Sequence, residues 1–193
     1  MHNNVITVFL YAQHIIISFT LVICENMRRM SEENLRNAFA GESQAYMKYV
    51  IFAEKAEEEG FKNIARLFRA VAYAEQVHAK NHLQASGLIR SISDNIKNAM
   101  ESERYEVEEM YPSYNAIAKL QDEKEAERTT NWALQAEKIH LTVYQKALKM
   151  VEERKDLEIG DIYICGKCGY TVEGELPEKC PICGAPKERF KKF

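Results

Sequence analysis

Two predicted helices carry a glutamate and a histidine, three residues apart, on the face that should enter a protein core. On a helix spanning residues 123–153, the stripe that holds Ala133 and Tyr144 also holds Glu137 and His140. Burying an ionised carboxylate without a partner costs several kcal/mol. The arrangement therefore predicts a cation in the core, and a metal ion is the simplest one.

The same substitution occurs on an earlier helix. There the stripe that includes Phe68 and Val71 continues with Glu75 and His78, again three residues apart and pointing the same way. A single pair is more often a histidine satisfied by its neighbouring glutamate. Two copies favour a metal site.

Capping and breaking residues divide the body of the chain into four predicted helices. Ser31 is expected to cap the first, which Gly60 ends, and Asp94 is expected to cap the third. Pro112 lies inside the third helix and should kink or bulge it. The four expected helices span residues 31–59, 61–86, 94–121 and 123–153.

Loop lengths show that inward carboxylates can meet. Glu42 lies 18 residues before the first predicted turn and Glu75 lies 15 after it, which places both roughly 25 Å along antiparallel helices. Around the turn near residue 122, Glu106 and Glu137 lie 16 residues before and 15 after. The chain is thus predicted to contain two similar helical hairpins that form a four-helix bundle with a carboxylate-rich core.

This constellation suits a pair of iron or manganese ions, because carboxylates can bridge two cations and one imidazole per metal leaves open positions. Glu75 and Glu137 are the expected bridges. Glu106 and Glu109 are three residues apart, so both can reach the core. This gives one carboxylate more than symmetry requires, which suggests a ligand that changes with oxidation state. The predicted ligands are Glu42, Glu75, His78, Glu106, Glu109, Glu137 and His140.

Three neighbouring residues are not assigned as ligands. Glu103 shares the inward stripe of the third helix, but for Glu103 and Glu108 a solvated face is preferred. His82 is expected to be a core histidine or a support for a ligand.

Four of the five cysteines stand in two Cys-x-x-Cys pairs near the C-terminus: Cys165, Cys168, Cys180 and Cys183. This spacing predicts a metal site in a reducing compartment rather than a disulfide framework. Spacing alone leaves structural zinc and redox-active iron equally favoured. A tail of this length has little core of its own, so its metal should hold it folded.

The first 29 residues differ from the rest. The run from Val5 to Cys24 is uncharged and long enough to cross a bilayer, and two arginines follow it. We favour an upstream extension of the reading frame, with Met27 or Met30 as the working start and Cys24 incidental. The expected location is the cytoplasm, and a membrane anchor through residues 5–24 is the alternative.

Length and composition agree with this division. The 193 residues, 46% of them hydrophobic, suit one medium domain plus a small module. The net charge of -3 gives no reason to expect nucleic acid. We expect a mainly α protein with an extension (residues 1–29), a metal-binding helical bundle (30–155) and a four-cysteine module (160–193).

Four motifs in order, followed by the cysteine-rich tail, closely resemble the rubrerythrin family. The resemblance covers Met30–Phe193. The motifs are AFAGESQA at residues 38–45, YAEQVH at 73–78, EVEEMYP at 106–112 and AEKIH at 136–140.

The resemblance implies a ferritin-like bundle with a non-haem di-iron site of the Fe-O-Fe type, in a homodimer or larger homo-oligomer. It implies reduction of hydrogen peroxide to water and protection from oxidative stress. Electrons would come from an NAD(P)H-linked reductase or a carrier such as rubredoxin, and would pass through a rubredoxin-like iron in the tail. Beside a di-iron bundle, iron is preferred to zinc in that site.

The resemblance also implies catalytic roles. The residue matching Glu109 gives way to the one matching His78 as iron is reduced, and Tyr49 and Tyr114 match tyrosines beside the site. Two alternatives rank below the peroxidase: iron oxidation and storage in a ferritin-like shell, and a non-enzymatic zinc-ribbon interaction protein.

Overall fold

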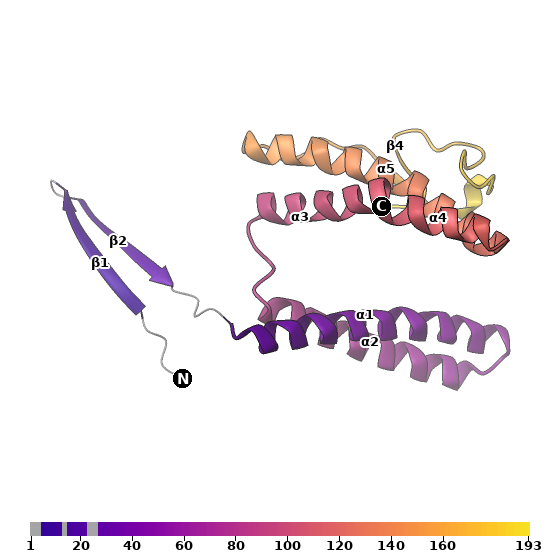
Figure 1. The fold of residues 1–193 in the computed structure, drawn as a ribbon, viewed down its shortest axis with the longest axis horizontal. Coiled ribbons are helices and arrows are strands. Elements are labelled where there is room, and N and C mark those ends of the chain that lie inside the picture. The colour runs from indigo at the N-terminus through magenta and orange to yellow at the C-terminus, as the bar shows by residue number, and fades with distance from the viewer. Residues whose placement is uncertain (1–4, 13–14, 23–26) are drawn as a thin grey trace. The chain divides into compact units, whose positions relative to one another are not determined.

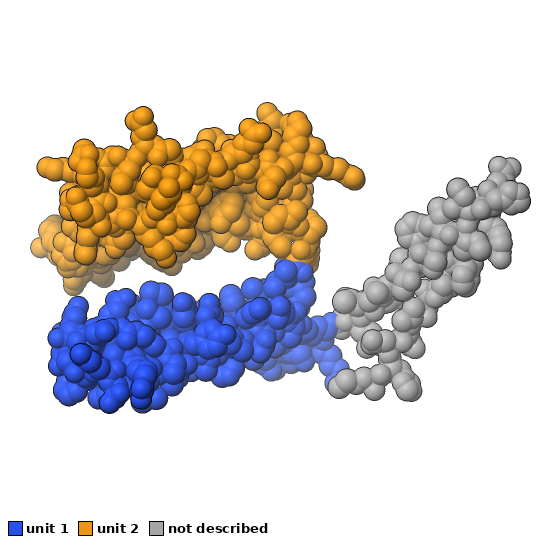
Figure 2. All heavy atoms as spheres, turned by 180° about the vertical axis from the view of Figure 1, so that it is seen from behind, with its two compact units in different colours: residues 1–89 blue, residues 90–193 orange. Residues whose placement is uncertain are grey.

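The structure is a computed structural model that describes residues 5–12, 15–22 and 27–193. The chain divides into two compact units, residues 1–89 and 90–193, which Figure 2 colours separately. Helices dominate both units, as the periodicity of the sequence predicted.

In the first unit, α1 (Arg29–Glu58) and α2 (Lys62–Ala85) form an antiparallel hairpin (Figure 1). The turn uses Gly60, whose φ of 85° favours a residue without a Cβ atom. Small side chains line the seam between the helices and allow the two backbones to approach closely. The buried seam residues are Ala53, Ala56, Ala65, Ala72 and Ala79.

Larger apolar side chains of this hairpin remain exposed. Five of them, all between 46% and 62% exposed, are Met47, Ile51, Phe52, Ile64 and Leu67. An amphipathic hairpin with such a face needs further helices to cover it. This requirement agrees with a bundle of four helices.

The uncharged N-terminal run forms two strands in its described parts. β1 (Val5–Ala12) pairs antiparallel with β2 (Ile15–Val22). The run has the length of a membrane-spanning helix, but its many β-branched and aromatic residues favour extended backbone. None of the helices in the described residues is long and apolar enough to cross a membrane. Cys24 lies outside the described residues.

The second unit begins with a helix that is interrupted by one π-helical segment. α3 (Ile92–Tyr105) continues into η1 (Glu106–Met110) and then into α4 (Tyr111–Leu120). The predicted bulge is therefore confirmed, and Pro112 is the second residue after it. Proline lacks the N–H that a regular α-helical turn would use, so a wider turn accommodates it. The long helix α5 (Lys124–Glu152) runs alongside (Figure 1).

Two predicted caps are wrong. Ser91 caps α3, because its Oγ accepts a hydrogen bond from the N–H of Asp94 at 3.2 Å and its hydroxyl donates to the Asp94 carboxylate at 2.7 Å. The first helix begins before Ser31, since the N–H of Glu32 already donates to the carbonyl of Arg28 at 3.1 Å. Each correction moves a helix start upstream by a few residues.

The tail is a small three-stranded antiparallel sheet in the order β4-β3-β5. Its strands are β3 (Ile162–Cys165), β4 (Thr171–Glu173) and β5 (Phe190–Lys192), and a 3-10 turn, η2 (Lys187–Arg189), precedes the last. Only Cys165, Cys180 and Ala185 are fully buried within the tail's core. So small a core depends on another source of stability.

The turn between α4 and α5 lies at Asp122, as predicted, where φ is 58°. A buried amide fastens it. Asn115, only 8% exposed, donates from Nδ2 to the carbonyl of Glu127 at 2.7 Å and to Oγ1 of Thr130 at 3.0 Å. One side chain thereby ties the end of one helix to the first turns of the next.

Replacing Asn115 with Ala should lower the free energy of unfolding by about 1–3 kcal/mol, because it removes a buried amide together with its hydrogen bonds to the carbonyl of Glu127 and to Oγ1 of Thr130. Asn131→Ala is the matched control, since Asn131 is exposed on α5, and it should change the free energy by less than about 0.5 kcal/mol. Urea unfolding followed by circular dichroism measures both. Equal losses in the two variants would contradict the assignment.

Candidate metal centres

The first unit brings three predicted ligands together. Glu42 on α1 and Glu75 and His78 on α2 offer ligand atoms that all lie within 4.8 Å of one another. Nδ1 of His78 is 3.0 Å from Oε2 of Glu75. The Glu75 side chain is 17% exposed and that of His78 is 53% exposed. The positions along the two helices that were estimated from the distance to the turn at Gly60 therefore agree with the structure.

The second unit forms a matching group around α5. Nδ1 of His140 lies 2.6 Å from Oε2 of Glu137, and a carboxylate oxygen of Glu103 completes a cluster within 4.8 Å. The solvated face expected for Glu103 is wrong, because this residue is half-buried. Glu103 lies in the last turns of α3, whereas Glu106 begins the π-helical turn. The wider turn changes the direction in which the later glutamates point.

The remaining carboxylates of this stretch lie differently. Glu106 is half-buried, and burial followed by the negative charge of Glu137 raises its pKa, so it lies beside the cluster. Glu109 and Glu108 are exposed. Neither they nor His82 belong to the clusters found in the described residues. The roles of Glu106 and Glu109 as ligands stay predictions.

The electrostatics of the second group show a surplus of negative charge. Burial, and then the hydrogen bond and charge of Glu137, raise the pKa of Glu103 to about 7. The hydrogen bond between Glu137 and His140 lowers the pKa of the carboxyl and raises the pKa of the imidazole. Without metal, protons offset the negative charge. A bound cation can replace them.

The two predicted tyrosines occupy different surroundings. The half-buried ring of Tyr49 packs against Phe52 and Phe68, with ring centroids 6.3 and 6.1 Å away. Tyr114 is exposed, and its ring meets that of Tyr111 edge-on at 6.4 Å. Their functional roles stay predictions.

Tyr111 is a candidate that sequence reasoning missed. Burial raises its pKa first, and the negative charges of Glu106 and Glu137 raise it further. This hydroxyl therefore lies within the field of the second carboxylate group. The available signal was its position directly before Pro112, where the bulged turn ends.

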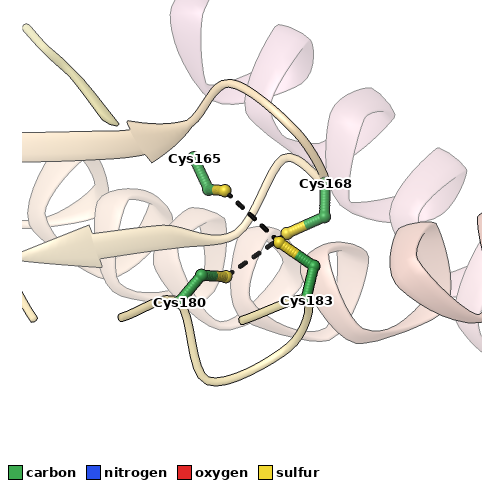
Figure 3. A group of neighbouring side chains, drawn as sticks. All are labelled: Cys165, Cys168, Cys180 and Cys183. Carbon is green, nitrogen blue, oxygen red and sulfur yellow. Dashed lines mark hydrogen bonds between the residues drawn. The ribbon is translucent and has the colours of Figure 1, made fainter. Parts of the chain in front are cut away.

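The four predicted cysteines form one cluster, shown in Figure 3. Sγ of Cys165 is 3.7 Å from Sγ of Cys183, and Sγ of Cys168 is 3.5 Å from Sγ of Cys180. A tetrahedral site with metal–sulfur bonds of about 2.3 Å has sulfur–sulfur edges of about 3.8 Å. All four are free thiols, so the donor set fits one tetrahedral soft metal ion.

The two Cys-x-x-Cys turns share one backbone design. The N–H of Gly169 donates to the carbonyl of Cys165, and that of Gly184 to the carbonyl of Cys180, both at 2.9 Å. Each glycine has a positive φ, of 79° and 70°. A side chain there would be strained, so glycine permits the chain to fold back around sulfur.

Backbone donors also prepare one thiol for ionisation. Burial raises the pKa of Cys165, but hydrogen bonds from the N–H groups of Lys167 and Cys168, together with those from the thiols of Cys183 and Cys168, lower the net pKa. Burial raises the pKa of Cys168 and of Cys183. A cation between the four sulfurs would favour their thiolate forms.

The four-cysteine module also touches the second carboxylate group. Nε2 of His140 lies 2.8 Å from Oγ1 of Thr171 on β4. No signal in the sequence predicts this contact, because 31 residues separate the partners and no periodicity relates them.

Comparison with known proteins identifies both parts of the chain. Residues 33–148 match the family model described as Rubrerythrin, and residues 163–191 match the one described as Rubrerythrin, rubredoxin-like domain. The chain belongs to the rubrerythrin family. Rubrerythrin-2 of Clostridium acetobutylicum is 44% identical over 178 residues, which cover 85% of this chain and 97% of the relative.

Other members of the family support the same assignment. Nigerythrin of Nitratidesulfovibrio vulgaris is 33% identical over 175 residues, with 83% of this chain and 85% of the relative covered. A solved structure described as the fully reduced state of nigerythrin (all ferrous) matches with a TM-score of 0.50 and 30% identity. That match covers 89% of this chain and 91% of the other.

Membership of the rubrerythrin family confirms a ferritin-like helical fold followed by a rubredoxin-like module. It also assigns iron to both kinds of cluster, a di-iron site to the carboxylates and histidines and one iron to the cysteines. The donors fit: carboxylates and imidazoles suit harder iron ions, and thiolates suit a tetrahedral one. The protein is thus a non-haem iron oxidoreductase in general class.

Removing one cysteine ligand should unfold the four-cysteine module and leave the helices folded. In Cys180→Ser the tail should lose its metal and the dispersed NMR signals of its sheet, because its core is too small to fold without the ion. Helical ellipticity should fall by less than about a tenth, since the helices have their own packing. Cys24→Ser is the matched control and should keep both the metal and the dispersion. A dispersed, metal-free Cys180→Ser tail would contradict this account.

The pKa of Glu103 sets the pH dependence of the metal-free protein. Its pKa is about 7 when folded and near 4.5 otherwise, so folding loses stability as pH rises between these values. Glu103→Gln should therefore raise the free energy of unfolding at pH 8 by about 1 kcal/mol, with partial exposure limiting the gain, and should change it little at pH 4. Glu108→Gln is the exposed control. A gain that is equal at both pH values would contradict the assignment.

Proposed function

We propose that this protein is a rubrerythrin-type peroxidase that reduces hydrogen peroxide to water and protects against oxidative stress. The observation that carries the proposal is the contact between His140 and the four-cysteine module within the second unit. A redox enzyme needs an electron-carrying centre close to its reactive metals, and α5 carries the proposed ligands Glu137 and His140. An iron store has no evident need of it.

Bound iron would supply the electrons for cleavage of the O–O bond and the open positions at which peroxide binds. The chain's own residues supply the rest. Glu75 and Glu137, each hydrogen-bonded to a histidine, are suited to hold the metals. Each peroxide takes up two electrons and two protons to give two waters. Glu103, half-buried beside Glu137, is placed to pass such a proton to the site.

Glu109 and His78 are proposed to exchange as ligands when the oxidation state changes. Both side chains are exposed, and Glu109 belongs to a π-helical turn, which is a common feature of functional sites. Tyr49 and Tyr114 are proposed to hydrogen-bond the reacting oxygens, with Glu42, Glu106 and His140 completing the ligand set.

The wider organisation follows the same proposal. Residues 30–155 would act as the di-iron domain and residues 160–193 as the entry point for electrons from rubredoxin or an NAD(P)H-dependent reductase. A homodimer or larger assembly would cover the exposed apolar face of the α1–α2 hairpin. Free cysteines fit a reducing cytoplasm.

Glu137→Ala should abolish metal binding at the carboxylate site and lower peroxide turnover by at least about 100-fold, while the Cys-bound iron keeps its red colour. The measurement is anaerobic stopped-flow: reduced protein is mixed with peroxide and the visible bands of the Cys-bound iron are followed. In the unmodified protein these bands should return rapidly.

Glu108→Ala, an exposed change on the same π-helical turn as Glu109, is the control and should react normally. Normal turnover by Glu137→Ala would place the reaction elsewhere. A colourless tail at every stage would indicate zinc and would defeat the electron-relay argument.

A further inference from the structure

One face of α5 is covered by the four-cysteine module, and the covered residues recur every four positions. They are Trp132, Ala136 and His140, which lie in one row along the helix. Nζ of Lys167 lies 5.4 Å from the ring centroid of Trp132. A Cβ atom placed on Gly169 would be 3.8 Å from Cβ of Ala136. Two of the smallest residues thus allow the module's turn to lie directly on the helix.

The polar contact in this row determines where the proton sits on His140. The hydroxyl of Thr171 donates to the carbonyl of Gly169 at 3.2 Å. A hydroxyl has one hydrogen, so Oγ1 must then accept from Nε2 of His140, 2.8 Å away. A neutral imidazole with its hydrogen on Nε2 has its lone pair on Nδ1. That nitrogen is the one beside Glu137, where a metal would bind.

We propose that Thr171 is a positioning residue for His140, through which metal affinity at the carboxylate–histidine group depends on the folded four-cysteine module. The inference rests on the proposed function in one respect, since it takes His140 as a ligand. The hydrogen bond fixes both the tautomer and the ring orientation that a metal needs. Partners of this kind change metal affinity by about 10–100-fold.

The position of Thr171 depends in turn on the cysteine site. Thr171 begins β4 and pairs with Ile164 of β3. The turn between the strands is closed by two hydrogen bonds, from the N–H of Cys165 to the carbonyl of Tyr170 at 2.8 Å and from the N–H of Gly169 to the carbonyl of Cys165 at 2.9 Å. A metal at the cysteines stabilises this turn and so fixes the hydroxyl. Because linkage is reciprocal, metal at the carboxylates stabilises the docked module equally.

The test uses the full chain with zinc in the four-cysteine site, titrated with Mn²⁺ and followed by the EPR signal of free Mn²⁺. Manganese prefers oxygen and imidazole ligands to thiolates, so it reports on the carboxylate groups. Thr171→Val should weaken the affected Mn²⁺ site about tenfold, and Thr171→Ser should restore it to within about twofold. Thr142→Val is the control, because that α5 hydroxyl donates only to its own helix, at the carbonyl of Lys138.

A second series tests the dependence on the module. Cys180→Ser should weaken the same Mn²⁺ site about tenfold, and adding Thr171→Val should change it by less than about twofold more. Retention of zinc by Thr171→Val shows that its module is still folded. Fully additive losses, or unchanged binding in a zinc-retaining Thr171→Val, would overturn the coupling.

His140→Ala separates this inference from the proposed function. If that variant loses the site while Thr171→Val keeps it, the ligand assignment stands and the coupling is wrong. If His140→Ala binds Mn²⁺ normally, the ligand assignment fails and the coupling fails with it.

Discussion

The hydrogen bond between a glutamate and the histidine three residues later is the interaction on which this protein is built. It occurs twice, between Glu75 and His78 at 3.0 Å and between Glu137 and His140 at 2.6 Å. Each pair takes positions on a helix face that would otherwise be apolar. The helices therefore give up hydrophobic contact in exchange for a site that binds cations. Metal-binding side chains thus replace apolar side chains that would otherwise pack in the core.

A metal ion has a different effect on stability in each of the two kinds of site. The carboxylate groups are partly buried on long helices, and metal there offsets charge that the fold has already gathered. The cysteine site lies in a tail with almost no core, and metal there supplies the folding energy itself. Their meeting at His140 and Thr171 joins a hard-ligand site to a soft-ligand one by a single hydroxyl group. The two metal sites need different ligands, and this hydrogen bond places them next to each other, as a redox protein requires.

Local signals in the sequence account for most of the fold. Helical periodicity and turn residues locate the helices, and the heights of Glu42 and Glu75 follow from the position of Gly60. The cysteine cluster follows from its spacing alone. Caps are less predictable, because Ser91 and Asp94 are both good capping residues and only the backbone geometry decides between them.

Two features could not be predicted from the sequence. One is the direction in which side chains point after the π-helical turn, and the other is the contact between the C-terminal module and α5. Pro112 marks the bulge in the third predicted helix, but not which glutamate the π-helical turn leaves facing Glu137. For that reason the solvated face predicted for Glu103 is wrong. Thr171 depends on how a separate module lies on α5, which no periodicity encodes. The N-terminal run shows the limit of composition, because uncharged residues rich in β-branched side chains suit a strand as well as a helix.

The alanine seam between α1 and α2 has a consequence for the rigidity of this hairpin. Each buried alanine removes little apolar area from water, so this hairpin gains little stability from its own interior. Most of its hydrophobic driving force resides in side chains that face outward. The second unit, by contrast, has the Asn115 tie and a metal-stabilised tail. The N-terminal hairpin should therefore become rigid only when other helices cover its apolar face.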